Sequence, residues 1–482
     1  MSTSALLALR ESDAGLRARW RPAIAVLAAA VAAVLIQSLW VPLDADVSWL
    51  ITVCERVLGG DRLYIDIVEV NPPASVWLYL PPVWAAERLG LRPEAVVVAS
   101  FITAALLSTA FAARLLRRLE DSQPEFLIPA IAFVLLVLPM ALFAQREHLA
   151  LILAVPSLSA FALIAEGKPL SRTEALAAGA MAGLIIVIKP PFALAIAAPA
   201  VWSVLRRRSV VPLLPGVAAA LVIVVAYALA FVTLEPAYFP WLRVFGRTYL
   251  RMHEVWWKLF CGGIVLFPAI ALALAAILRP VRMPPLAAMW ALGAAGFCAA
   301  GLIQAKNYPN HWLPGGALAL LAMLVLILLP HPDRKRRWFI SEALMFLAIF
   351  EVRAATIFPD MKLVSLIERE APPAPRMMEL GSQLTTGHPA TRLVGGHWVA
   401  SRAGLFTAAG ARFVGRDGPQ VAAIYREDIS SFAADVRKGR PDLILVDRPE
   451  KRWLMQEPEI RDAMAAFRPV ARDGDTELWL RR

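Results

Sequence analysis

The sequence predicts an α-helical membrane protein that crosses the bilayer many times and ends in a small soluble α/β domain. The 482-residue chain is 59% hydrophobic and 18% charged, with a mean hydropathy of +0.60. Apolar runs recur between Ile24 and Phe358, and many are long enough for a membrane span, which needs about 20 largely apolar residues. Beyond Asp360 the composition changes to that of a water-soluble domain.

The distribution of charge orients the predicted helices. A net charge of +11 would suggest nucleic acid in a soluble protein, but here the positive-inside rule accounts for it, so we expect no nucleic-acid partner. Arg17, Arg19 and Arg21 precede the first apolar run, which places the N-terminus in the cytoplasm. That run lacks a small-residue cleavage site and is interpreted as a retained helix.

Threading the chain through the bilayer gives about eleven spans. The segment Ala74–Arg88 is short, interrupted by prolines and charged at its end, so we interpret it as an amphipathic helix on the outer surface. Arginine-rich loops then face the cytoplasm, and the C-terminal domain faces the periplasm of a bacterial inner membrane. The approximate spans are Ala23–Trp40, Ala95–Leu115, Phe126–Phe143, Leu149–Ala165, Ala175–Ile188, Phe192–Leu205, Pro212–Leu234, Leu259–Leu278, Pro284–Ile303, Trp312–Leu329 and Trp338–Phe358.

These patterns divide the chain into two domains. Residues 1–360 form the predicted membrane domain, with an external loop over about 42–94, and residues 361–482 form the periplasmic α/β domain. The C-terminal domain follows a proline-rich linker and alternates strand-like with helical patterns. Its predicted strands are Arg392–Gly395, Leu443–Asp447 and Glu477–Leu480, and its predicted helices are Ile429–Lys438 and Ile460–Phe467.

The loop after the first span is acidic in an otherwise basic chain. Between Pro42 and Pro73 it holds six acidic and two basic residues. Asp44 and Asp46 directly follow the first span, and Glu69 and Asn71 precede a double proline. A bland alternative is that Asp44 only caps the helix that follows it.

Other costly polar groups fall on the same predicted face of the membrane. An ionised group at mid-membrane costs a few kcal/mol or more, so such groups usually line a cavity or a pathway. Each also has a structural alternative: a hairpin ion pair, a lysine that snorkels to the interface, or an aromatic belt. The groups are Gln145, Arg146, Glu147 and His148 in a predicted hairpin, Lys189 before two prolines, Arg243 and Arg247 in the loop Glu235–Lys258, and Lys306, Tyr308 and His311 in an external turn.

This set of residue types suits group transfer from a lipid phosphate. A surface carboxylate can take the proton from an attacking hydroxyl. Lysine and arginine can hold a phosphate and stabilise its charge as it leaves. The chain has no P-loop, so activation would come from the lipid-linked donor itself.

Two stretches resemble the membrane glycosyltransferases of the GT-C superfamily, which include the protein O-mannosyltransferases and the lipid A aminoarabinose transferase. The first runs from Asp46-Val-Ser-Trp49 through Gly59–Asp66 to Glu69-Val-Asn71-Pro-Pro73. The second is Lys306-Asn-Tyr308 followed by Pro314. The resemblance implies a GT-C-like membrane domain with an external soluble domain.

The resemblance also implies roles for individual residues. Asp46 or Asp44 would be the catalytic base. Lys306, with Arg146 or Lys189, would contact the polyprenyl phosphate of a lipid-linked sugar donor. His311 and Glu147 would line the sugar site. The remaining candidates for substrate binding are Glu69, Asn71, His148, Arg243, Arg247 and Tyr308.

This chain departs from the protein O-mannosyltransferases at the base, where they carry adjacent Asp-Glu and Ala45 here separates two aspartates. Both aspartates therefore remain candidates, with Asp46 favoured. Some GT-C enzymes use a divalent metal and others do not, and no His/Asp/Glu cluster in the sequence requires one. The expected partners are membrane lipid, the lipid-linked donor and a glycan, lipid or protein acceptor.

Two other functions remain open at this point. An envelope polysaccharide polymerase or ligase would act on a diphosphate-linked glycan and would carry arginine-rich external loops. A transporter or flippase for lipid-linked sugars would carry broken helices, and Lys189-Pro-Pro191 fits such a break. The C-terminal domain would either recognise the acceptor or act as a passive cap.

Overall fold

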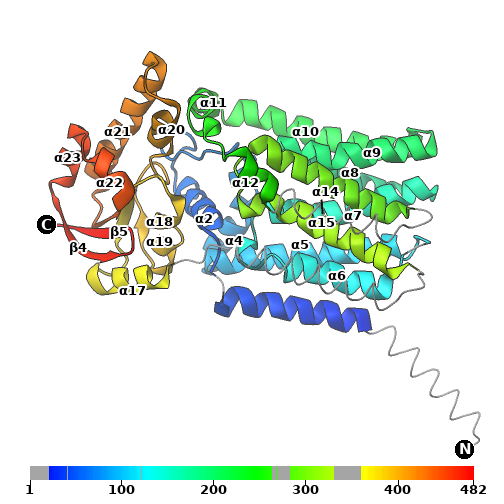
Figure 1. The fold of residues 1–482 in the computed structure, drawn as a ribbon. Helices are drawn as coiled ribbons and strands as arrows, with labels where there is room; N and C mark the ends of the chain where they lie inside the picture. The colour runs from blue at the N-terminus through cyan, green and yellow to red at the C-terminus, as the bar shows by residue number, and fades with distance from the viewer. Residues whose placement is uncertain (1–20, 41, 121, 263–268, 270–282, 330–359) are drawn as a thin grey trace, which may run out of the picture. The chain divides into compact units, whose positions relative to one another are not determined.

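The computed structural model describes residues 21–40, 42–120, 122–262, 269, 283–329 and 360–482. The predicted span Trp338–Phe358 lies outside these residues, as does most of Leu259–Leu278. The chain divides into two compact units. We call Met1–Val41, Val98–Ala228 and Glu254–Thr356 the helical unit, and Pro42–Val97, Leu229–His253 and Ile357–Arg482 the mixed unit. Figure 1 shows their elements coloured along the chain.

The helical unit is built around α14, which packs against α7, α9 and α15. Short 3-10 turns interrupt the chain at η2 (Met140–Leu142), η3 (Pro190–Phe192) and η4 (Val211–Leu213). Its helices are Arg21–Leu39, most of α5 (Pro93–Leu116), α6 (Pro124–Leu136), α7 (Arg146–Glu166), α8 (Arg172–Ile188), α9 (Ala193–Arg207), most of α10 (Leu214–Leu234), α12 (Trp256–Cys261), α14 (Pro285–Gln304) and α15 (Pro309–Leu328).

Six of the described helices are long and apolar enough to cross a membrane. The predicted number of eleven spans is therefore not confirmed. The predicted span Phe126–Phe143 is shorter than expected, because α6 ends at Leu136 and Pro139 precedes the 3-10 turn η2; proline has no N–H to continue a helix. The six are Arg21–Leu39, Pro93–Leu116, Arg146–Glu166, Val211–Leu234, Pro285–Gln304 and Pro309–Leu328.

Polar residues predicted in external turns belong instead to the first turns of helices. Gln145 is extended and α7 begins at Arg146, so the predicted hairpin Gln145–His148 is mostly helix. Glu147 in the first turn suits the positive end of the helix dipole. In the same way α15 begins at Pro309, a residue suited to the first helical position, and His311 is helical.

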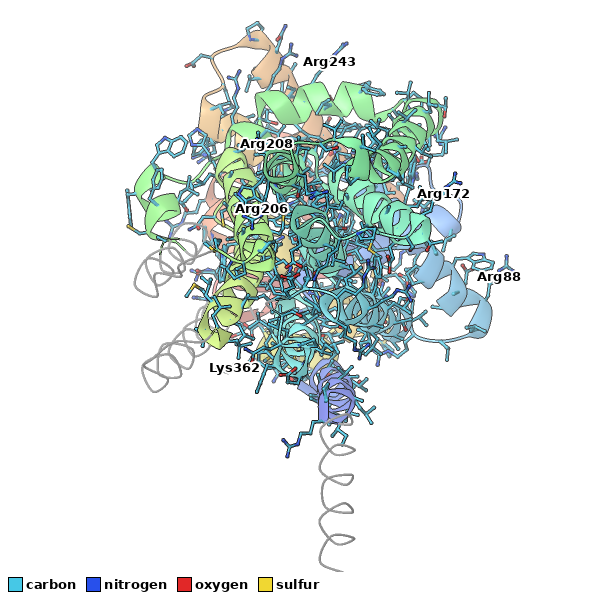
Figure 2. All side chains as sticks on the ribbon, turned by 90° about the vertical axis from the view of Figure 1, so that its right-hand side faces the viewer. Arg88, Arg172, Arg206, Arg208, Arg243 and Lys362 are labelled. Carbon is cyan, nitrogen blue, oxygen red and sulfur yellow. The ribbon has the colours of Figure 1, made fainter. Side chains whose placement is uncertain are left out.

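One end of the helical unit is basic. Glu174 at the start of α8 accepts from Arg114 and Arg118 at the end of α5, at 2.7 and 2.9 Å. Lys168, just after α7, donates to the Arg118 carbonyl at 2.6 Å. Figure 2 looks along the helices from this end, where Arg172 and Arg206 are labelled. The threading assigns these helix ends to the cytoplasm, and the opposite ends of α7 and α8 carry Arg146 and Lys189.

The mixed unit contains a five-stranded sheet of order β2-β1-β3-β5-β4. The first three strands in that order are parallel, and β5 is antiparallel to both of its neighbours. Buried Leu443–Val446 place β3 in the core, as an apolar run in a central strand predicts. The strands are β1 (Arg376–Leu380), β2 (His397–Trp398), β3 (Leu443–Asp447), β4 (Phe467–Asp473) and β5 (Thr476–Arg481).

The two later predicted strands and the predicted helix Ile429–Lys438 of the C-terminal domain are confirmed, whereas the predicted helix Ile460–Phe467 ends at Met464 and Phe467 begins β4. The predicted strand Arg392–Gly395 is wrong. It is the short helix α19 followed by a turn in which Gly395 has a φ of +64°, a conformation that suits glycine. The helices are α17 (Met361–Glu370), α18 (Leu384–Gly387), α19 (Ala390–Leu393), α20 (Phe406–Val414), α21 (Pro419–Gly439), α22 (Arg448–Leu454) and α23 (Pro458–Met464).

The first external loop belongs to the same compact unit as the C-terminal residues. The Val68 amide donates to the Ser401 carbonyl at 2.8 Å, so loop backbone pairs with C-terminal backbone. The compact unit therefore extends across the change of composition near residue 360. Its remaining elements are α2 (Ala45–Leu58), α3 (Ala74–Trp77), α4 (Leu80–Leu89), α11 (Tyr238–Arg247) and η5 (Tyr249–Arg251).

Candidate functional site

Asp44 and Asp46 lie at the start of α2. Asp44 is the N-cap residue, and its carboxylate accepts a hydrogen bond from the Asp46 amide at 2.8 Å. Asp46 lies in the first turn, and both residues are half-buried. The capping alternative for Asp44 is thus realised in the structure. The partial positive charge of a helix N-terminus favours ionised carboxylates, which is the form that a general base requires.

Glu69 and Asn71 hold the first loop together. Glu69 is buried, and its Oε2 accepts from the Trp49 indole at 2.5 Å. Its Oε1 accepts from the Asn71 amide nitrogen and side chain, at 2.9 and 2.5 Å. The Tyr64 hydroxyl donates to the Asn71 carbonyl at 2.7 Å. These contacts give Glu69 and Asn71 a structural role, and their contact with substrate stays a prediction.

The predicted arginines of the Glu235–Lys258 loop lie on α11. Arg243 and Arg247 are both exposed, and Arg243 is labelled at the surface in Figure 2. The helix is attached to the first loop through the Trp241 indole, which donates to the Tyr64 carbonyl at 2.9 Å. The arginines therefore lie in the same compact unit as Asp44 and Asp46.

A buried ion pair marks the polar end of the helical unit. Glu147, which is fully buried, pairs with Lys189, whose side chain is 12% exposed. Lys189 also donates to the Gln304 side chain at 3.1 Å. The start of α7 and the ends of α8 and α14 therefore meet here. Lys189 does not simply extend to the membrane surface, as the snorkelling alternative requires.

His311 adds a fourth helix to this cluster. It is buried in the first turn of α15 and interacts electrostatically with Lys189, Glu147, Arg146 and Lys306. The neighbouring Asn310 side chain donates to Gln145 at 3.2 Å. His311 Nδ1 and Glu147 Oε2 are buried with no hydrogen-bond partner among the described residues.

Lys306 and Tyr308 lie in the turn between α14 and α15. Burial lowers the pKa of Lys306 to about 8. Tyr308 is 47% exposed, and its ring centroid is 5.5 Å from that of His311. We call Arg146, Glu147, Lys189, Lys306 and His311 the cationic cluster, because three cationic side chains and one carboxylate in it interact electrostatically with His311.

His148 stands apart from this cluster. Its Nδ1 accepts from the Ala144 amide at 3.1 Å, and its Nε2 lies 2.7 Å from the Leu135 carbonyl. The ring also packs against Phe143, with centroids 4.7 Å apart. Both nitrogens thus join the end of α6 to the start of α7. These contacts give His148 a structural role, and a contact with substrate stays a prediction.

The described residues contain no group of three or more His, Cys, Asp or Glu side chains placed to hold a metal ion. Sequence reasoning missed two contributors to the sites described above. Gln304 is the polar last residue of an apolar helix, a signal that was available. Trp49 enters the sequence argument only as the last residue of Asp46-Val-Ser-Trp49. Nothing local in the sequence indicates the hydrogen bond from its indole to Glu69.

The fold of this chain is similar to that of a solved structure. ArnT from Cupriavidus metallidurans, crystallised with undecaprenyl phosphate, aligns with a TM-score of 0.54 over 95% of this chain and 97% of ArnT, at 16% sequence identity. The chain has the fold of ArnT. The resemblance predicted from the first loop and the Lys306 turn is thus confirmed at the level of the GT-C fold.

Two structures of the oligosaccharyltransferase AglB from Archaeoglobus fulgidus also align. One, with an inhibitory peptide and a dolichol phosphate, has a TM-score of 0.45 and 12% identity over 93% of this chain and 72% of AglB. The other, with zinc and sulfate, has a TM-score of 0.40 and 14% identity over 92% and 71%. No protein-family model and no curated protein matches the sequence.

Proposed function

We propose that this protein is a glycosyltransferase that moves a sugar from a polyprenyl-phosphate donor to an acceptor hydroxyl at the periplasmic face of a bacterial inner membrane. The cationic cluster of the helical unit carries the proposal. Arg146 and Lys189 are almost fully buried, Lys306 is half-buried, and Lys189 pairs with Glu147. Three cationic side chains in one cluster can bind a phosphate through charge-assisted hydrogen bonds.

A lipid phosphate suits the position of the cluster. The side chains lie at the ends of α7, α14 and α15, which are apolar enough to cross a membrane, so a phosphate at the membrane surface would reach them with its lipid tail in the bilayer. Lys306, with Arg146 or Lys189, would bind the phosphate and stabilise its charge as it leaves. Glu147 would keep Lys189 charged and in place, and His311 would line the sugar site.

Asp46 or Asp44 would act as the base. The acceptor oxygen attacks the anomeric carbon, the bond from that carbon to the phosphate oxygen breaks, and the carboxylate takes the hydroxyl proton. The phosphate leaves with the bonding electron pair. The fold shared with ArnT, which was crystallised with undecaprenyl phosphate, supports a polyprenyl phosphate as the lipid part of the donor.

The test is transfer of a labelled sugar from lipid-linked donors in membranes that contain Asp44→Asn, Asp46→Asn or both. We expect at least one single variant to lose about 10²-fold or more in rate. Glu87→Gln, which removes an exposed acid of α4 in the same loop, is the matched control and should retain full activity. Full transfer by the double variant would rule out the base assignment.

The phosphate assignment has a separate test. Lys306→Ala and Arg146→Ala should raise the donor KM or abolish transfer, since each removes a cation that would bind the phosphate. In reconstituted vesicles, movement of a labelled donor across the bilayer without any transfer would contradict the proposal and support a flippase.

A further inference from the structure

The C-terminal part of the mixed unit contacts the helix that begins with the candidate base. Arg392 of α19 donates to both carboxylate oxygens of Glu55 in α2, at 2.5 and 2.9 Å. Its Nε donates to Glu94 at 2.6 Å. The Arg392 side chain is only 12% exposed. A buried bidentate arginine that joins two carboxylates is stronger and more directional than an ordinary surface ion pair.

Further contacts lie along α2 toward its start. Arg392 also donates to the Thr52 hydroxyl at 3.3 Å. One turn earlier, the Trp49 ring meets the His388 ring edge-on, with centroids 5.3 Å apart. Asp46 precedes Trp49 by three residues, which is close to one helical turn, so both lie on the same side of the helix. Both residues belong to one continuous helix, so a displacement of α2 also displaces Asp46.

His388 supports the same helix by packing rather than by charge. It is fully buried between Trp49 and Trp398, whose ring centroid lies 4.7 Å away. Neither ring nitrogen has a hydrogen-bond partner among the described residues. Burial and the nearby Arg392 lower its pKa to about 3, so the ring is neutral at physiological pH. Arg392 is thus the charged, directional part of this attachment.

We propose that Arg392 is a positioning residue, whose bidentate contact with Glu55, anchored by Glu94, fixes α2 and thereby the candidate base at its start. The consequence for catalysis rests on the proposed function. The effect on α2 does not, because it follows from the hydrogen bonds alone. The C-terminal domain then has a part in catalysis whichever acceptor it contacts.

A positioning role has a kinetic signature that a general loss of folding lacks. Arg392→Ala should lower kcat about tenfold or more, since small misplacement of a catalytic group is costly. The donor KM should stay unchanged, because the cationic cluster belongs to the helical unit. The kcat of Arg392→Lys should lie between those of the wild type and Arg392→Ala, since lysine retains the charge but not the two-pronged geometry.

The structural arm of the experiment is hydrogen–deuterium exchange on the full-length protein in lipid nanodiscs. Arg392→Ala should increase amide exchange in peptides that cover Ala45–Leu58 and leave α7 and α14 unchanged. Arg448→Ala is the matched control, because it removes an arginine of the same domain whose ion pairs are with Asp475 and Glu477. It should change neither exchange in α2 nor kcat.

The possible outcomes separate the two proposals. Wild-type exchange over Ala45–Leu58 in Arg392→Ala overturns the positioning role, and so does an unchanged kcat in an active enzyme. If Arg392→Ala increases exchange throughout the chain, Glu55→Gln decides by the same measurements, since it leaves the Glu94 contact in place. Increased exchange in α2 alone, in a protein with no transfer activity of any kind, supports the attachment and contradicts the proposed function.

Discussion

At the scale of single residues, Lys306 makes the pH dependence of the proposed reaction predictable. Burial lowers its pKa to about 8, so the amine is charged below that pH and loses its charge as the pH rises through it. A neutral amine attracts phosphate less. The donor KM should therefore rise as the pH increases above about 8. Steady-state kinetics between about pH 6.5 and 9.5 would measure this change.

Lys306→Arg is the control for that prediction. Arginine remains charged throughout this range, so the rise in donor KM above about pH 8 should disappear. The same rise in Lys306→Arg would show that another group titrates.

The ion pair of Glu147 and Lys189 makes a prediction about stability. Glu147→Gln leaves Lys189 almost buried without its carboxylate, and loss of one partner of a buried pair costs about 3–5 kcal/mol. The thermal unfolding midpoint in detergent should fall markedly. Glu254→Gln, which breaks a more exposed pair with Lys258, should change it little. Equal shifts in the two variants would contradict a special role for the buried pair.

At the scale of elements, α8 and α10 pack closely where glycine residues of the two helices face each other. A Cβ on Gly179 would lie 2.0 Å from the Gly216 carbonyl oxygen, and one on Gly183 would lie 2.8 Å from the Ala220 carbonyl oxygen. Small residues allow membrane helices to approach this closely. Gly179→Ala should therefore lower the unfolding midpoint, although alanine favours helix.

Gly246→Ala in α11 is the matched control for the crossing. A Cβ there would have no atom within 4 Å among its described neighbours, so the substitution should be neutral or stabilising by up to about 1 kcal/mol. A Gly179→Ala protein as stable as Gly246→Ala would show that the two helices separate without cost.

Hydropathy predicts some elements of this fold and fails for others. The long apolar helices α5, α7 and α14 follow from hydropathy and from the arginines at their ends, because the cost of polar groups in lipid is a local property of the sequence. The predicted span Phe126–Phe143 is too long because Pro139 precedes a 3-10 turn. The predicted strand at Arg392 is wrong because the segment forms a short helix and a turn. Arg146, Lys189 and Lys306 stand out in the sequence because they interrupt apolar runs, and the structure brings them together around His311.

At the scale of the whole molecule, the sequence does not predict which segments of the chain form the mixed unit. It joins three segments of chain, and contacts such as Arg392 with Glu55, 337 residues apart, leave no local pattern in the sequence. The hydrogen bond from Trp49 to Glu69 was also missed, because the residues of a loop show no helix or strand periodicity that would place the two side chains together.

Deletion of Ala371–Arg482 tests this organisation. The truncated chain loses Arg392, His388 and Ser401, which contact the first loop. Limited proteolysis should then cleave within residues 42–97 while residues 98–228 remain protected. Lipid-linked donor should still bind to the truncated protein, whereas transfer should be lost. Equal protection of residues 42–97 in the truncated and full-length proteins would contradict the prediction.

The long separation between α2 and Arg392 also sets the order of assembly in the cell. A ribosome adds about 5–20 residues per second, so α2 is made roughly 20–70 s before Arg392. During that interval the ring of Trp49 and the carboxylate of Glu55 lack the C-terminal groups that cover them in the finished protein. The helical unit is largely synthesised before the mixed unit can close. A chain released early from the ribosome would therefore carry the cationic cluster without a fixed α2, and completion of translation would decide when the protein first becomes competent for transfer.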